Sequence, residues 1–399
     1  MFKFLKSLLI YFSWVIGFSV IAGLIMFFYV PIEKDLETIL VITIMLCIPL
    51  LSIFVIGFIK GKIKILGIHG RWSLIFRSAI FTSCLISFIL LGVGQSAMAE
   101  MLVSEYDKNT VTNSEKIEFV KDIGRRLSSN KLRGEYIKTL DSISPNNRLT
   151  VYYSNEDKDL ADKLVRAIPD IETQLSKMFA VVEPFPIDIV LYDDLNQYRT
   201  NNDIDETQRI LGLYTNKRIH MANTKVSAEI FKTSTLDLDL INMNYEEEIL
   251  NTLEHEYTHY YIRAFLMENK LNPEIPRWLD EGLAVYHESE GYITDAEFDF
   301  PDLKDSAIPL QDLISQVEWD QYTESETASD IAYNESFMVI YELIKLKGEK
   351  VVTDILAGIP KEQDLSTSYQ TLFENSFIDH VGLSLEEFQD QVINKYSTK

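Results

Sequence analysis

The sequence predicts an α+β protein in two main parts: an α-helical membrane domain with three transmembrane helices, and a domain that combines a small sheet with helices. Three observations support this prediction. Three long stretches near the N-terminus contain no charged residue, a β-α-β pattern begins near residue 149, and a later helix carries two histidines four residues apart. The predicted domains are residues 1–99, a helical connector at 100–147, and residues 148–399.

The uncharged stretches are residues 9–30, 38–59 and 78–99. Each is long enough, as a helix, to cross a hydrocarbon layer of about 30 Å. A cleaved signal peptide is the alternative for the first stretch, but its apolar run is longer than that of a signal peptide and two further stretches follow. We therefore expect a multi-pass protein of the cell membrane that contacts the lipid bilayer through three spans.

The charges beside these stretches predict their orientation. The loop between the second and third stretches contains basic residues and no acidic ones: Lys60, Lys62, Lys64, Arg71 and Arg77. Loops rich in lysine and arginine stay on the cytoplasmic side of a membrane. We therefore expect a cytoplasmic N-terminus and an extracytoplasmic location for the part of the chain after residue 100.

Net charge and cysteine content limit the chemistry and partners of the chain. The formal charge is −23, and most acidic residues follow residue 100, which argues against nucleic acid as a partner. Cys47 and Cys84 both lie in the predicted spans, so we expect no thiol catalysis in the following domain. The oligomeric state is not predicted.

The second domain begins with alternating strand and helix signals. Residues 149–153 and 186–192 are rich in β-branched and aromatic residues, and residues 157–179 between them have apolar residues at helical spacing. Residues 212–221 have the pattern of a hairpin that turns at residues 216–217. We expect a small sheet with helices on one side.

The strongest chemical signal is HEYTH, in a predicted helix at residues 245–269 whose acidic first turn suits the helix dipole. Residues four apart lie on one face of a helix, so His255 and His259 can direct their imidazoles at one zinc ion. Glu256 lies one residue off that axis, where it can act as a general base on a zinc-activated water. The alternative is that these are ordinary polar residues of an amphipathic helix, but with six histidines in the chain a chance match is uncommon.

A third ligand is expected from PRWLDEGLAVY at residues 276–286, a second helix with proline in its first turn. Glu281 offers a carboxylate, and two histidines with one glutamate and an open position for water are a common catalytic zinc set; a solvated helix carboxylate is the alternative. Gly282 has no side chain, so we expect it to let this helix approach the first helix closely. Neighbouring side chains on a helix point about 100° apart, so if Glu281 faces the metal, Asp280 points aside and is free to contact a ligand from outside or to cap the helix. His287 lies about 9 Å beyond Glu281 along the helix axis.

HEYTH followed by PRWLDEGLAVY resembles the gluzincin, or thermolysin-like, zinc metallopeptidases, and especially the compact bacterial peptidase-MA-like domains. The similarity covers about residues 148–395. It implies a thermolysin-like fold, with a small sheet, the HExxH helix and a helical C-terminal part. It also implies one zinc ion per chain, bound by His255, His259 and Glu281, with Glu256 as the general base.

For function, the resemblance implies zinc-dependent hydrolysis of peptide bonds in a peptide or protein substrate. It also implies that residues 212–221 provide an edge strand above the metal, where an extended peptide can add as a further strand. By residue type alone, Tyr333, His220 and Tyr214 are candidates for stabilising the oxyanion. The substrate, its cleavage preference and any activating partner are not predicted.

Two other classes of function stay open. One is a catalytically silent zinc-site domain that serves as a receptor or assembly module, and the other is an accessory subunit of a membrane complex. The intact Glu256 argues against the first class. The near absence of charged residues in the predicted spans argues against a transport path.

Overall fold

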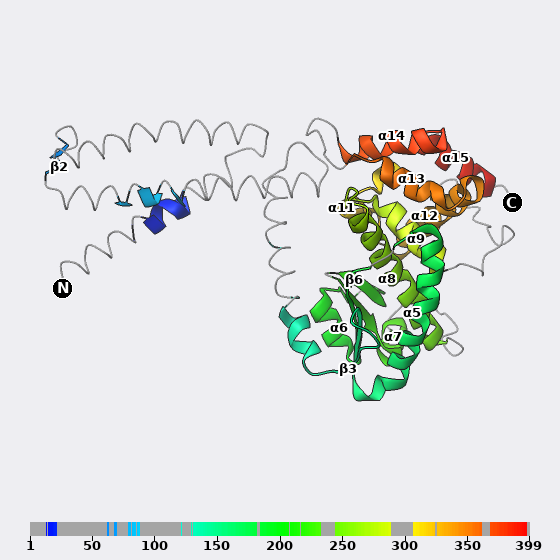
Figure 1. The fold of residues 1–399 in the computed structure, drawn as a ribbon, viewed down its shortest axis with the longest axis horizontal. Helices are drawn as coiled ribbons and strands as arrows, with labels where there is room; N and C mark the ends of the chain where they lie inside the picture. Colours follow the sequence, from blue (N-terminus) through cyan, green and yellow to red (C-terminus); the bar gives the residue numbers. More distant parts are fainter. Residues whose placement is uncertain are drawn as a thin grey trace. The chain divides into compact units, whose positions relative to one another are not determined.

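The structure is a computed structural model. In it the chain divides into two units, Met1–Lys121 and Asp122–Lys399 (Figure 1). The described residues are 13, 15–21, 62–63, 68–69, 79–80, 82–84, 86–87, 121, 129, 131–181, 184–206, 208–215, 217–232, 244–288, 306–323, 325–360 and 368–396. The predicted domain boundaries near residues 99 and 147 stay predictions.

The described part of the first unit contains short elements. An antiparallel pair joins β1 (Lys62–Ile63) to β2 (Ile68–His69), and helical residues occur at 15–21 and around residue 80. Among the described residues of the whole chain, no helix is both long enough and apolar enough to cross a membrane.

The predicted fold class included a membrane domain, and this finding corrects that part of the prediction. A transmembrane helix needs about 20 consecutive apolar residues, and no described helix meets that requirement. The three-span membrane domain, the multi-pass location in the cell membrane and the bilayer as a partner are therefore not supported. Most residues of the predicted spans, 9–30, 38–59 and 78–99, lie outside the described residues.

The second unit contains a five-stranded mixed sheet with the strand order β3-β4-β5-β7-β6. The strands are β3 (Asp141–Ile143), β4 (Leu149–Tyr153), β5 (Ile187–Tyr192), β6 (Gly212–Thr215) and β7 (Arg218–Ala222). Strands β4, β5 and β7 are parallel, and β3 and β6 pair antiparallel at the two edges. The strands predicted at residues 149–153 and 186–192 and the paired strands of the hairpin at 212–221 are confirmed. Asn216, in the predicted turn of the hairpin, lies outside the described residues.

Helices cover both faces of this sheet, which corrects the expectation of helices on one side (Figure 1). The helices are α5 (Lys158–Met178), α6 (Leu195–Asn202), α7 (Thr224–Lys232) and α8 (Tyr245–Glu268). Val151 and Met221 belong to the core with α5 and α8, whereas Val190 and Tyr192 belong to the core with α6 and α7. The central strands are parallel, and parallel strands are normally buried on both faces.

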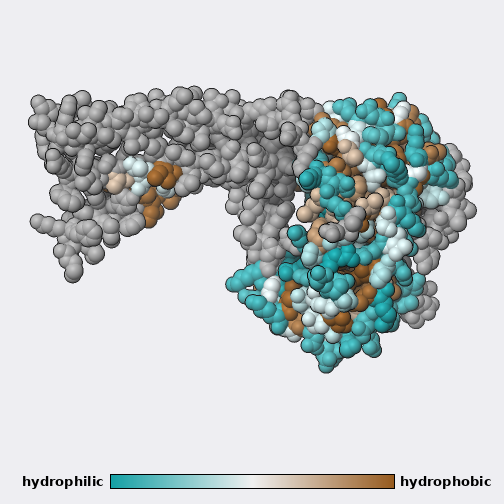
Figure 2. Space-filling model, viewed as in Figure 1, coloured by the Kyte–Doolittle hydropathy of each residue, from teal (hydrophilic) through white to brown (hydrophobic). Residues whose placement is uncertain are grey.

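The described residues after α8 are mostly helical. Their α-helices are α9 (Arg277–Glu288), α11 (Gln316–Tyr322), α12 (Glu326–Lys347), α13 (Lys350–Gly358), α14 (Tyr369–Val381) and α15 (Leu385–Tyr396). Figure 1 shows α13, α14 and α15 at the opposite end of this unit from β3. The core with α5 and α8 continues into this end and includes Trp278 of α9 and Phe373 of α14. Figure 2 shows hydrophilic residues over much of the visible face of this unit, with hydrophobic patches among them.

Two glycines allow close contacts near Glu256 and Glu281. At Gly212 of β6, an added Cβ would lie 2.7 Å from Cγ of Glu256, so the glycine lets this edge strand lie against α8. At Gly282 of α9, an added Cβ would lie 2.7 Å from the carbonyl oxygen of Ser336 in α12. The expectation that Gly282 lets α9 approach the HEYTH helix is therefore wrong, because the close approach is to α12.

Candidate metal centre

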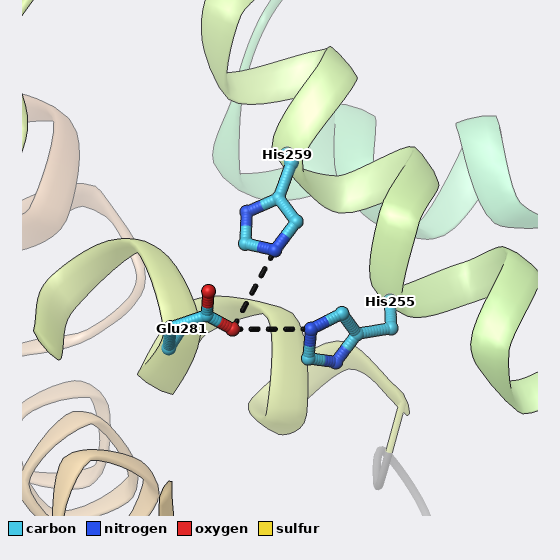
Figure 3. Close-up of side chains that lie close together, drawn as sticks. All are labelled: His255, His259 and Glu281. Carbon is cyan, nitrogen blue, oxygen red and sulfur yellow. Dashed lines mark hydrogen bonds and ion pairs between the residues drawn. The ribbon is translucent and has the colours of Figure 1, made fainter. Parts of the chain in front are cut away.

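Three side chains from two helices meet at one point (Figure 3). His255 and His259 project from α8 and Glu281 from α9, and their ligand atoms all lie within 4.8 Å of one another. In Figure 3 both imidazoles face the same carboxylate oxygen. This group can hold a metal ion.

The separations between these atoms fit a tetrahedral ion. Oε2 of Glu281 lies 3.2 Å from Nε2 of His255 and 3.6 Å from Nε2 of His259. Ligands held about 2.0–2.1 Å from a tetrahedral ion stand roughly 3.3 Å apart. The two distances from Glu281 are therefore close to those of a tetrahedral site.

The other ring nitrogen of each histidine lies beside a carboxylate. Nδ1 of His255 is 3.1 Å from Oε2 of Glu288, and Nδ1 of His259 is 3.1 Å from Oδ1 of Asp280, where the contact is an ion pair and not a hydrogen bond. Such partners orient an imidazole and leave Nε2 as the ligand nitrogen. This contact is of the kind expected for Asp280, which would touch a ligand side chain without binding the metal itself.

Sequence reasoning missed Glu288. The signal that could have found it is its position seven residues after Glu281, which places both carboxylates on one face of the same helix.

Two arginines balance the buried carboxylates. Arg277 forms ion pairs with Glu281 and, at 3.4 Å, with Asp280, while NH2 of Arg263 lies 2.8 Å from Oδ2 of Asp280. Burial raises the pKa of both carboxyl groups, but this effect is outweighed by Arg263 and His259 at Asp280 and by Arg277 at Glu281, so both pKa values are lowered. Both carboxylates are therefore charged at neutral pH even without a metal.

The histidine pKa values respond to the same carboxylates. Burial lowers the pKa of His255, but hydrogen bonds with Glu281 and Glu288 outweigh it and hold that pKa well above its usual value. Burial also lowers the pKa of His259, yet Asp280 and Glu281 raise it to about 9. Because a metal binds the neutral imidazole, metal binding at neutral pH displaces protons here.

Glu256 lies beside the ligand group without belonging to it. Its side chain is buried, and its Oε2 accepts a 2.6 Å hydrogen bond from the backbone N–H of Tyr214 on β6. Burial raises the pKa of Glu256, while His255 and His259 act in the opposite direction. A fixed carboxylate with a raised pKa is suited to accept a proton.

Of the three oxyanion candidates, Tyr333 on α12 lies beside a ligand. Its ring centre is 6.4 Å from that of His255. Burial and the charge of Glu281 hold the pKa of Tyr333 well above its usual value. The phenol therefore stays protonated and can donate a hydrogen bond.

The other two candidates lie differently. The ring of Tyr214 packs 6.2 Å from that of Tyr260, and it is the backbone N–H of Tyr214 that contacts Glu256. His220 is directed toward the α6 and α7 face, where its Nδ1 lies 3.1 Å from the hydroxyl of Tyr192. The structure does not bring His220 to the ligand group.

His287 does not belong to the group of His255, His259 and Glu281. It is buried, with its ring centre 6.3 Å from that of Phe179. Its position, six residues beyond Glu281 on α9, directs it to the core with α5.

Comparison of the sequence with protein-family models finds no match, and comparison with curated proteins finds none either.

Proposed function

We propose that the chain is a zinc-dependent metallopeptidase of the gluzincin type, which hydrolyses peptide bonds in a peptide or protein substrate. The proposal rests on one observation: the ligand atoms of His255, His259 and Glu281 lie within 4.8 Å of one another. Glu256 stands beside them as a separate buried carboxylate. The two sequence motifs that resemble gluzincins supply these four residues.

Zinc is proposed because of the donor set. Two imidazole nitrogens and one carboxylate oxygen are a common protein contribution to catalytic zinc sites, which keep a fourth position open for water. Carboxylates beside both Nδ1 atoms leave both Nε2 atoms to face the ion. We expect one ion per chain.

In the proposed reaction, His255, His259 and Glu281 would hold a zinc ion, which when bound would polarise the scissile carbonyl and lower the pKa of a water molecule. Glu256 removes a proton from the attacking water and later delivers it to the leaving amine. The backbone N–H of Tyr214 holds the Glu256 carboxylate in place at 2.6 Å, and burial brings its pKa closer to neutral. The hydroxyl of Tyr333 is the proposed donor to the oxyanion, because its raised pKa keeps it protonated.

The place of β6 supports a peptide as the substrate. This strand is at the edge of the sheet, and its residue Tyr214 contacts the proposed base. An extended peptide that adds to β6 would therefore pass close to Glu256.

The test uses the full chain loaded with zinc and a mixed peptide library, with Glu256→Gln as the matched variant. We expect cleavage by the unaltered chain, loss of cleavage with a chelator and recovery on adding zinc. The amide variant should bind one zinc per chain without cleaving. Zinc binding without any peptide cleavage by the unaltered chain would favour the silent receptor or assembly module instead.

A further inference from the structure

The two oxygens of Glu281 have different neighbours. Oε2 faces the histidines, at 3.2 Å from Nε2 of His255 and 3.6 Å from Nε2 of His259. Oε1 is paired with NH2 of Arg277, which lies one helical turn earlier on α9. One oxygen is therefore directed to the metal position and the other is held away from it.

Arg277 itself has a fixed place. Its backbone N–H donates a 2.8 Å hydrogen bond to the carbonyl oxygen of Ile314. NH1 of its guanidinium lies 3.4 Å from Oδ2 of Asp280, and only 26% of the side chain is exposed. Because an arginine keeps its charge at any pH at which the protein is folded, the pairing with Glu281 does not depend on the protonation of Arg277.

The number of carboxylate oxygens that bind the ion decides how many positions are left. A zinc ion with two histidines and one carboxylate oxygen keeps a fourth tetrahedral position for water. A carboxylate that binds through both oxygens takes up a further position and crowds that water. Binding by Glu281 through one oxygen therefore leaves the most room for the water.

We infer that Arg277 is a positioning residue that keeps Glu281 a one-oxygen ligand and so keeps the water position open. The inference rests on the proposed metal site and adds to it a residue that neither binds the metal nor touches the substrate. It predicts that loss of the guanidinium releases Oε1 of Glu281 to bind the ion.

Arg263 provides the matched control. Like Arg277, it is a partly exposed arginine that pairs with Asp280, through a contact of 2.8 Å. Unlike Arg277, Arg263 does not pair with Glu281 among the described residues; its Nη1 donates a 3.2 Å hydrogen bond to the carbonyl oxygen of Pro273. Arg263→Gln therefore removes the same charge near the site without freeing Oε1.

The experiment replaces zinc by cobalt(II) in the full chain and records the visible absorption spectrum. Four-coordinate cobalt(II) absorbs severalfold more strongly than five- or six-coordinate cobalt(II), so the spectrum reports coordination number independently of activity. The unaltered chain should give the strong four-coordinate spectrum. Arg277→Gln should weaken it severalfold, and Arg263→Gln should leave its intensity unchanged.

Several results would overturn the inference. They are a five- or six-coordinate spectrum in the unaltered chain, an unchanged intensity in Arg277→Gln, or an equal loss in both arginine variants. The first of these needs no variant, so it can overturn the inference even if Arg277→Gln does not fold. Failure of the unaltered chain to take up cobalt(II) or zinc at all would instead reject the proposed metal site and function.

Discussion

A single added methyl group at Gly282 tests the packing that places Glu281. An added Cβ would lie 2.7 Å from the carbonyl oxygen of Ser336 and 2.9 Å from Cγ1 of Ile340, both in α12. The oxygen belongs to the helix backbone, so it cannot rotate away as the end of a side chain can. In Gly282→Ala, α9 and α12 therefore have to move apart by several tenths of an ångström.

The expected loss of stability follows from two opposing effects. Overpacking a core contact costs about 1–3 kcal/mol. Alanine in place of a helical glycine otherwise stabilises a helix by about 1 kcal/mol. We expect a net destabilisation of about 0–2 kcal/mol, which lowers the unfolding temperature by up to roughly 8 °C. Because Glu281 is the preceding residue, zinc affinity should also fall.

Thermal unfolding followed by circular dichroism, with and without zinc, measures both effects. Gly134→Ala is the control, because it lies in a helical segment and an added Cβ there meets no atom within 4 Å. The control should unfold at the same or a higher temperature than the unaltered chain. If Gly282→Ala unfolds as late as this control, the close contact between α9 and α12 does not exist as described.

The remaining predictions concern the ligands, the proposed base and a buried carboxylate. In zinc titrations, Glu281→Ala should lose most of its affinity and Asp280→Ala should weaken it by about 10–100-fold. His287→Ala should leave affinity nearly unchanged, and full affinity in Glu281→Ala would reject the site. Glu256→Gln should retain zinc but lose peptide turnover, so near-normal turnover would reject its role as the base. Burial raises the pKa of Glu335 from its usual 4.5 to about 7, so its contribution to stability is complete below pH 4.5 and is lost as the pH rises through about 7. Denaturant unfolding between about pH 4 and 8 should show a decline that Glu335→Gln reduces, and an equal decline in both proteins would contradict this.

The two histidines of the candidate metal site on α8 could be predicted from the sequence because their relation is local. His255 and His259 share one face of any helix that contains them, whatever the rest of the fold does. The same reasoning separates Asp280 from Glu281 by about 100° on α9, and the structure places Asp280 beside His259.

The helices on both sides of the sheet were not predicted. Helix α6 (Leu195–Asn202) is short and contains three polar or charged residues for every apolar one, so it has no clear apolar periodicity. Its position depends on Tyr198, which packs 5.3 Å from the ring of Tyr192 on β5. A contact between separate elements of this kind leaves no periodic signal in the sequence.

The sequence by itself determined which ligand types are present and which of them share a helix face, because a helix repeats every 3.6 residues whatever its surroundings. Only the tertiary structure decided that Glu288 lies beside His255, that Arg277 holds one oxygen of Glu281, and that the N–H of Tyr214 reaches Glu256. These contacts join different helices and strands, or depend on which rotamer the packed core allows. They follow from how the whole core packs, and the spacing of residues along the chain does not encode that packing.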